Sequence, residues 1–215
     1  TYIASLLETY THVYGKRMTI VDWVRGIKPK KVSYRKFYYT NISTDVLALA
    51  VRGATGSTLG KFIEHTIWND MGAESQGSWL VDSNNDALAH GFFRAERMDW
   101  ARLGLYYSRT MRTDTCFGKY LRSAATRQNN DKGYGYQIWV DHENLPRTTL
   151  RFAGRHGQRL FLDKKTGLIA VIHSAADESS FREYGGVFSN KGRRKQTQIW
   201  QLKRIFREIN GDPPK

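Results

Sequence analysis

One stretch of the sequence decides the fold: residues 150–172, Leu150-Arg151-Phe152-Ala153-Gly154-Arg155-His156-Gly157-Gln158-Arg159-Leu160-Phe161-Leu162-Asp163-Lys164-Lys165-Thr166-Gly167-Leu168-Ile169-Ala170-Val171-Ile172. Three short runs rich in apolar residues, 150–153, 159–162 and 168–172, each predict a strand. The link 163–167 ends in a glycine, as a hairpin turn with a positive φ requires. The sequence therefore predicts antiparallel strands here.

Helical patterns dominate the chain before these strands, because apolar residues recur there at helical spacing. Four helices are predicted. The first covers 44–51 and is ended by Gly53 or Gly56, and the second follows Ser57-Thr58 and is ended by Gly72, with Leu59, Phe62, Ile63 and Ile67 on one face. The third contains Met98, Ala101 and Leu105, and the fourth contains Phe117, Tyr120, Leu121 and Ala124.

Two further elements complete the prediction. The alternation of Tyr134, Tyr136, Ile138 and Val140 predicts another strand. The apolar stripe Ile199–Ile209 predicts a final amphipathic helix. Helices followed by an antiparallel sheet and a covering helix indicate an α+β fold. We divide it into a helical region, 1–132, and a sheet region, 133–215.

Composition bounds the class of protein. The 215 residues, 40% of them hydrophobic, suit one globular core, and no apolar run approaches the ~20 residues of a membrane helix. The net charge of +14 comes with no nucleic-acid or zinc motif, so we expect a solvated basic surface. Cys116 is a single cysteine, which leaves the compartment open. Any targeting signal is expected outside this chain.

Four motifs carry the functional signal. Tyr39-Thr40-Asn41 precedes a helix, and Gly154-Arg155-His156-Gly157-Gln158 lies between two predicted strands. Between them come Met98–Leu105, which contains Asp-x-Ala-Arg-x-Gly, and Gly133–Trp139, which reads Gly-Tyr-Gly-x-x-Trp. In this order they resemble the class C β-lactamase-like and penicillin-binding serine hydrolases. Esterases, D-amino-acid peptidases and 6-aminohexanoate-dimer hydrolases belong to that group, and the likeness covers most of Trp23–Ser174.

The resemblance implies a β-lactamase/transpeptidase-like fold and a role for each motif residue. Tyr39 would be the proton carrier, and Asn41 would position a lysine or the substrate. The backbone amide of Arg155 would donate to the oxyanion, with His156 on the same edge of the cleft. Gly154, Gly157 and Gln158 would line the substrate. No metal or cofactor is implied. The family slightly favours a periplasmic or secreted location.

The Ser-x-x-Lys nucleophile motif of the family is not found where the resemblance requires it. Ser33-Tyr34-Arg35-Lys36 has the right letters but stands only three residues before Tyr39, whereas the family places the serine on a separate upstream helix. Lys165-Thr166-Gly167 spells a third motif of class A enzymes but falls in the predicted hairpin turn. We therefore expect the nucleophile in a segment preceding Thr1, and expect this chain alone to be inactive.

The reaction class is then acyl transfer to serine, with a small amide, ester or β-lactam-like molecule as substrate. Two alternatives stay open. The chain could belong to a non-catalytic relative that binds a peptide, a peptidoglycan fragment or a partner protein in the same cleft, or to a basic interaction module of unrelated function. Pocket shape decides among substrates of this class, and sequence does not give it.

Overall fold

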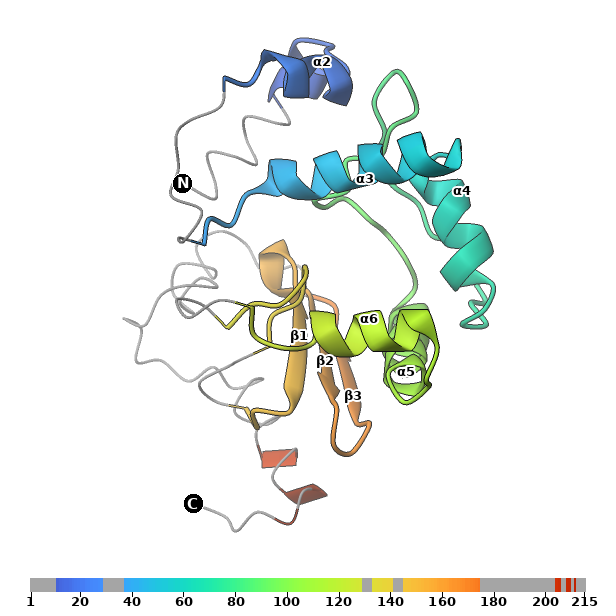
Figure 1. Ribbon diagram of the computed structural model, residues 1–215, viewed down its shortest axis with the longest axis vertical. Coiled ribbons are helices and arrows are strands. Elements are labelled where there is room, and N and C mark those ends of the chain that lie inside the picture. The colour runs from blue at the N-terminus through green and yellow to red at the C-terminus, as the bar shows by residue number, and fades with distance from the viewer. Residues whose placement is uncertain are drawn as a thin grey trace. The chain divides into compact units, whose positions relative to one another are not determined.

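The computed structural model (Figure 1) describes residues 11–28, 37–128, 133–140, 145–174, 204–205, 208–209 and 211. The chain divides into two compact units, Thr1–Glu96 and Arg97–Lys215. This boundary precedes the change from helical to alternating pattern at residue 133, so the helices that follow Glu96 belong to the unit that holds the sheet.

The described regular elements of the first unit are all helices, and residues 73–96 after them are irregular, with isolated bridges between Ser78 and Arg94 and between Val81 and Ala87. The helices are η1 (Thr11–Gly15), α2 (Ile20–Gly26), α3 (Asn41–Thr55), α4 (Leu59–Ile63) and η2 (Glu64–Trp68). Val13, Ile20 and Leu88 form its small core, with Val24 and Leu49 packed against them. A carboxylate fixes the start of α2, because Asp82 Oδ2 accepts the Ile20 N–H at 2.7 Å. The core therefore depends on polar as well as apolar contacts.

The two helices predicted for this unit are confirmed, with shifted bounds. α3 begins at Asn41, three residues before the predicted start, and ends at Gly56, whose φ of +68° is left-handed. Thr58 caps α4 by accepting the Lys61 N–H. α4 continues directly into η2, and the turn at Gly72, with φ +72°, follows. The predicted apolar face of this second helix is half-buried.

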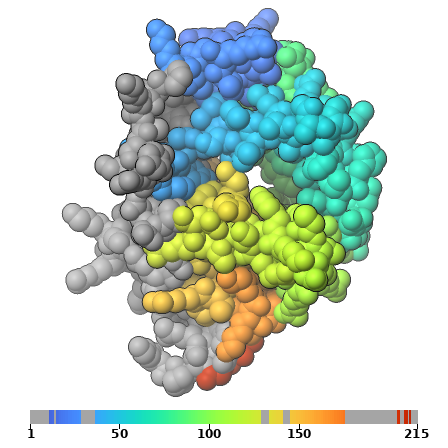
Figure 2. Space-filling view, in the orientation of Figure 1, coloured from blue at the N-terminus to red at the C-terminus, as the bar shows by residue number. Residues whose placement is uncertain are grey.

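The second unit combines two helices with a sheet. Its elements are α5 (Arg97–Thr110), α6 (Cys116–Ala124), β1 (Thr149–Ala153), η3 (Arg155–Gly157), β2 (Arg159–Asp163) and β3 (Ile169–Ile172). The strands are antiparallel in the order β1-β2-β3, which confirms the three predicted strands and the α+β class. In Figure 2 the atoms of α6, in yellow-green, lie in front of the yellow and orange strands.

The core of this unit lies between the helices and one sheet face. Leu150, Leu160 and Leu162 are at most 3% exposed and pack with Leu121 and Ala124 of α6. The burial predicted for Leu121 and Ala124 is thus confirmed, whereas Tyr120 on the same helix is half exposed.

α5 is confirmed as a helix, but the face suggested by Met98, Ala101 and Leu105 is not its buried one. Met98 is 60% exposed, and the buried positions are Asp99, Gly104 and Ser108. The reason is a close approach to the sheet: a Cβ at Gly104 would lie 2.9 Å from Cγ2 of Ile169. The face of α5 that contacts the sheet therefore contains the small residue Gly104. A search for a stripe of apolar residues does not find such a face.

The strand predicted over residues 134–140 is wrong. The segment turns back on itself, because Gly135 N–H donates to the Ile138 carbonyl at 2.8 Å and Gln137 is left-handed, with φ +59°. Tyr134 and Trp139 form an isolated bridge, and Trp139 pairs with Arg151 of β1. Tyr134, Ile138 and Val140 are buried, but Tyr136 is 44% exposed and Trp139 is buried, so the predicted alternation does not hold and the residues belong to a turn.

The hairpin between β2 and β3 matches the prediction. Asp163 accepts the Lys165 N–H and the Thr166 hydroxyl, and Gly167 has φ +76°. Lys165 is exposed at the turn. Lys165, Thr166 and Gly167 therefore form part of the hairpin turn, as the sequence predicts.

Replacing Lys165 by Ala should change the free energy of unfolding by less than about 0.5 kcal/mol, because the side chain is exposed and its backbone contact remains. Urea unfolding measures this. Asp163→Ala is the contrasting variant: it removes a fully buried carboxylate that holds the turn, so it should destabilise clearly. Equal effects of the two variants would contradict this description of the turn.

Within the described residues, no helix has the length and apolar character to cross a membrane. Most of the predicted terminal helix, Ile199–Ile209, lies outside the described part of the chain. Ile205 and Ile209 are described, in helical turns, and are 45% and 52% exposed. The Ser33–Lys36 segment also lies outside the described residues.

Candidate functional site

Tyr39 and Asn41 lie at the start of α3 in the first unit. Tyr39 is half-buried in the segment leading to the helix, and Thr40 has extended angles, with φ −137° and ψ 141°. Asn41 is the first helical residue and is 2% exposed. Within the Tyr-x-Asn motif the backbone thus changes from extended at Thr40 to helical at Asn41.

A buried polar cluster continues from Asn41 along α3. Asp45 lies one turn further on the same helix face and is fully buried. Its Oδ1 accepts the His90 backbone N–H at 3.1 Å, and its Oδ2 is 2.8 Å from His90 Nδ1. The carboxylate is an acceptor, so Nδ1 carries the proton in this contact. Asp45 therefore fixes the loop around His90 to the helix that begins with Asn41.

Two atoms of this cluster have no hydrogen-bond partner among the described residues. They are Nδ2 of Asn41 and Nε2 of His90, and both are buried. Buried polar atoms are nearly always hydrogen-bonded, so such exceptions call for an explanation. The sequence motif identified Asn41. Asp45 could have been found as the helical neighbour of Asn41, but no local pattern points to His90.

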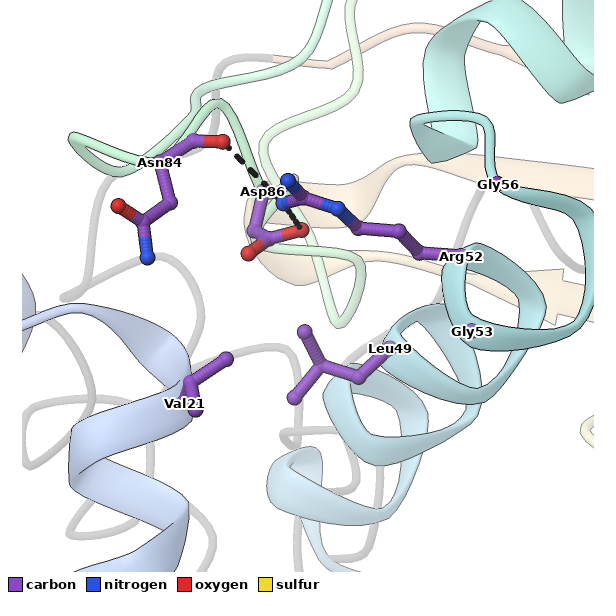
Figure 3. A pocket seen from close by; sticks show the side chains of 7 residues that line it. All are labelled: Val21, Leu49, Arg52, Gly53, Gly56, Asn84 and Asp86. Carbon is purple, nitrogen blue, oxygen red and sulfur yellow. Dashed lines mark hydrogen bonds and ion pairs between the residues drawn. The ribbon is translucent and has the colours of Figure 1, made fainter.

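A separate pocket of about 420 Å³ lies in the same unit (Figure 3). Val21 and Leu49 face each other across it, and Arg52 reaches from α3 to Asp86, with Nη1 2.5 Å from Oδ1. The hydrogen bond that Arg52 donates to the Asp86 carboxylate raises the pKa of the Arg52 guanidinium, which stays charged. The lining is Val21, Leu49, Arg52, Gly53, Gly56, Asn84 and Asp86. It includes none of the predicted site residues.

The second group of predicted residues forms one turn between β1 and β2. Gly154 N–H donates to the Gln158 carbonyl at 2.9 Å and closes the turn. His156 is left-handed, with φ +59° and ψ 21°, and Gly157 has φ +90°. A left-handed residue other than glycine is uncommon and is a recognised feature of functional sites. The structure thus brings Gly154, Arg155, His156, Gly157 and Gln158 together.

The side chain of Gln158 is already engaged within this unit. Its Oε1 accepts the Ser174 N–H at 3.2 Å, and its Nε2 donates to the Ser174 carbonyl. Sequence reasoning gave Gln158 a place on the substrate side. Both ends of its amide contact the backbone of Ser174, beyond β3.

Arg151 is a buried cation that sequence reasoning missed. It is 9% exposed, and its guanidinium carbon lies 5.4 Å from the centre of the Trp139 ring. Burial, and then the charge of Arg159, lower the pKa of Arg151 to about 10. Its Nε has no hydrogen-bond partner in the described parts of the chain. Burial therefore makes the charged form of the Arg151 side chain less favourable in the folded state than in water.

Arg151→Met should raise the free energy of unfolding at pH 7 by on the order of 2–3 kcal/mol, because it removes the cost of burying this charge. The lowered folded-state pKa means that the cost is present below about pH 10 and is relieved as the pH rises through that value. Urea unfolding is the measurement, and Arg147→Met, at an exposed position, is the matched control. Destabilisation by Arg151→Met would show that the contact of the guanidinium with the Trp139 ring outweighs the cost of burying the charge.

In the described residues, no three His, Cys, Asp or Glu side chains come together as metal ligands. Of the predicted site residues, Tyr39 and Asn41 lie in the first unit and the other five lie in the second. The first unit therefore offers the phenol of Tyr39 and the buried amide of Asn41, and the second unit offers the turn Gly154–Gln158 with its left-handed residue His156.

The family model described as Beta-lactamase matches residues 6–187, so the chain belongs to the Beta-lactamase family. This confirms the resemblance drawn from the four motifs. Among curated proteins, none matches the chain.

Two solved structures show the same fold. One is a Bacillus anthracis protein provisionally described as a 6-aminohexanoate-dimer hydrolase, with a TM-score of 0.69 and 20% identity over 91% of this chain and 50% of that one. The other is a provisional β-lactamase from Bacteroides dorei DSM 17855, with a TM-score of 0.56 and 12% identity over 74% of this chain and 57% of that one. This chain therefore spans about half the length of each structure.

Proposed function

We propose that the full-length protein containing this chain is a serine hydrolase that forms an acyl-enzyme with a small amide, ester or β-lactam-like substrate. The observation that carries the proposal is Asn41, a buried amide at the start of α3 whose Nδ2 has no partner among the described residues. It stands two residues after Tyr39, in the motif that a chain of this family uses beside its nucleophile.

The proposed reaction has two steps. The serine oxygen attacks the substrate carbonyl and forms an acyl-serine bond, and the leaving amine or alcohol departs with a proton. Water then attacks the acyl group, releases the acid and restores the serine. Tyr39 carries the proton, because a phenol with a pKa near ~10 becomes a useful base when a neighbouring ammonium favours its anion. Asn41 positions that ammonium or the substrate.

The turn Gly154–Gln158 supplies the other half of the chemistry in this proposal. The negative oxygen formed on attack needs N–H donors that are already in place. We assign one of them to the backbone amide of Arg155, with His156 beside it and Gly154 and Gly157 allowing the backbone to approach the substrate. The constrained backbone at His156 supports this assignment.

The nucleophilic serine and its lysine are proposed to lie in a part of the protein outside this chain. The support is that Ser33–Lys36 ends only three residues before Tyr39, and that this chain spans 50% and 57% of the two structures with the same fold. A serine and a lysine three residues apart share one face of a helix.

The test is labelling by a fluorophosphonate, followed by intact mass spectrometry. The full-length protein should gain one adduct and hydrolyse members of a panel of amides, esters and β-lactams. Residues 1–215 alone should gain none. A full-length protein that is neither labelled nor active would indicate the non-catalytic relative. Labelling of residues 1–215 would place the nucleophile in this chain, and Ser33→Ala would be the next variant to examine.

A further inference from the structure

The turn between β1 and β2 contacts Ser174, which follows β3 in the chain. Gln158 uses both atoms of its amide on Ser174: Oε1 accepts the backbone N–H at 3.2 Å, and Nε2 donates to the backbone carbonyl. The register of the sheet makes this possible, because Arg159 lies opposite Ile172. One side chain thus ties the start of β2 to the chain leaving β3.

Gly157 packs against the same residue. A Cβ added at Gly157 would lie 2.9 Å from Ser174 Oγ and 3.0 Å from Ser174 Cβ. Its φ of +90° also disfavours any other residue. The turn therefore approaches Ser174 as closely as a glycine permits, and Gln158 holds it at that distance.

Arg159 holds the carbonyl groups of the turn. Its Nη1 donates to the carbonyls of Gly154 and Gln158, each at 2.7 Å. The Gln158 carbonyl also accepts the Gly154 N–H. Both ends of the turn are thus fixed by hydrogen bonds, and Arg155 and His156 lie between them. We call Gln158, Arg159 and Ser174 the turn brace.

We infer that Gln158 is a positioning residue, which acts through the turn brace to hold the Arg155 amide where the oxyanion forms. The inference rests on the proposed function. An oxyanion donor works only if it is preorganised, and a misplacement of about 1 Å can reduce the rate about 100-fold. A backbone amide depends on the surrounding chain for its position, and Gln158 is the side chain that links this turn to β3.

The experiment measures kcat and KM for the full-length protein on a chromogenic ester, together with its rate of labelling by a fluorophosphonate. Gln158→Glu keeps the size and the acceptor but places a carboxylate oxygen against the Ser174 carbonyl. Gln158→Met keeps the size and removes both hydrogen bonds. Each should lower kcat about 10- to 100-fold and change KM less than about two-fold.

Two controls separate positioning from general loss of stability. Ile169→Val trims a half-buried residue of β3, and Lys165→Ala changes the exposed turn at the other end of the strand. Both should keep the wild-type kcat, and thermal melts identify any variant that is unfolded at the assay temperature. If Gln158→Met does not fold, Gln158→Glu carries the test.

The outcomes distinguish the inference from the function on which it rests. A wild-type protein that is labelled while the folded Gln158 variants react at its rate overturns the positioning role and leaves the hydrolase standing. A fall in kcat shared by Ile169→Val overturns it as well, since stability alone would then explain the effect. A wild-type protein that is not labelled overturns the proposed function, and the inference with it.

Discussion

Replacing Tyr39 by Phe in the full-length protein is expected to lower kcat by about 10²–10⁴-fold while leaving the fold intact. The change removes one oxygen atom and the proton it carries, and keeps the half-buried ring that leads into α3. A proton carrier acts in the transition state, so kcat and kcat/KM should fall together.

The neighbouring residue supplies the control. Tyr38 is 55% exposed, and Tyr38→Phe makes the same chemical change one position earlier, so its kcat should match the wild type. Turnover of a chromogenic ester is measured for both variants, with circular dichroism to compare their folds. If Tyr39→Phe retained wild-type turnover, Tyr39 would not be the proton carrier.

Gly135→Ala should destabilise the protein severely, with a loss of at least about 4 kcal/mol or failure to fold. A Cβ at this position would lie 1.8 Å from the Ala124 carbonyl oxygen and 2.8 Å from that of Thr126. Both are backbone atoms at the end of α6, so no side-chain movement relieves the clash. The hydrogen bond from Tyr136 N–H to the Ala124 carbonyl would also break.

Gly53→Ala is the matched variant with the opposite expected sign. Gly53 lies inside α3, and a Cβ added there meets no atom within 4 Å. Alanine should stabilise the helix by up to about 1 kcal/mol. Urea unfolding followed by tryptophan fluorescence compares the two variants. Similar small effects would mean that residues 133–140 do not pack on α6 as described.

The regular parts of this fold were predictable because their signals are local. Three runs of apolar residues joined by short links gave the strands, and Gly167 marked the hairpin. The alternation at 134–140 misled because Gly135 and Gln137 let the segment turn back, while Tyr134 and Ile138 are buried as in a strand. The alternation of residue types at 134–140 therefore does not correspond to an alternation of buried and exposed positions, because Tyr136 is 44% exposed and Trp139 is buried.

The candidate site was predictable only where residues are adjacent in sequence. The motifs around Tyr39 and His156 were found from their letters, but the contact between Asp45 and His90 joins positions 45 residues apart. The contact of Gln158 with Ser174 depends on the strand register. Arg151 gave no signal, because a charged residue in a strand predicts exposure unless its neighbours are known.

The order of the strands also affects how the protein is made. β1, β2 and β3 pair in the sequence in which they are synthesised, and closing the short links between them costs little entropy. Such local pairing is the kind that forms fastest, and chains begin to fold while they are still on the ribosome. We expect the turn with Arg155 and His156 to form soon after Ser174 has emerged, before any substrate is met. Substitutions in this turn should then reduce the yield of folded protein during translation, in addition to any effect on turnover.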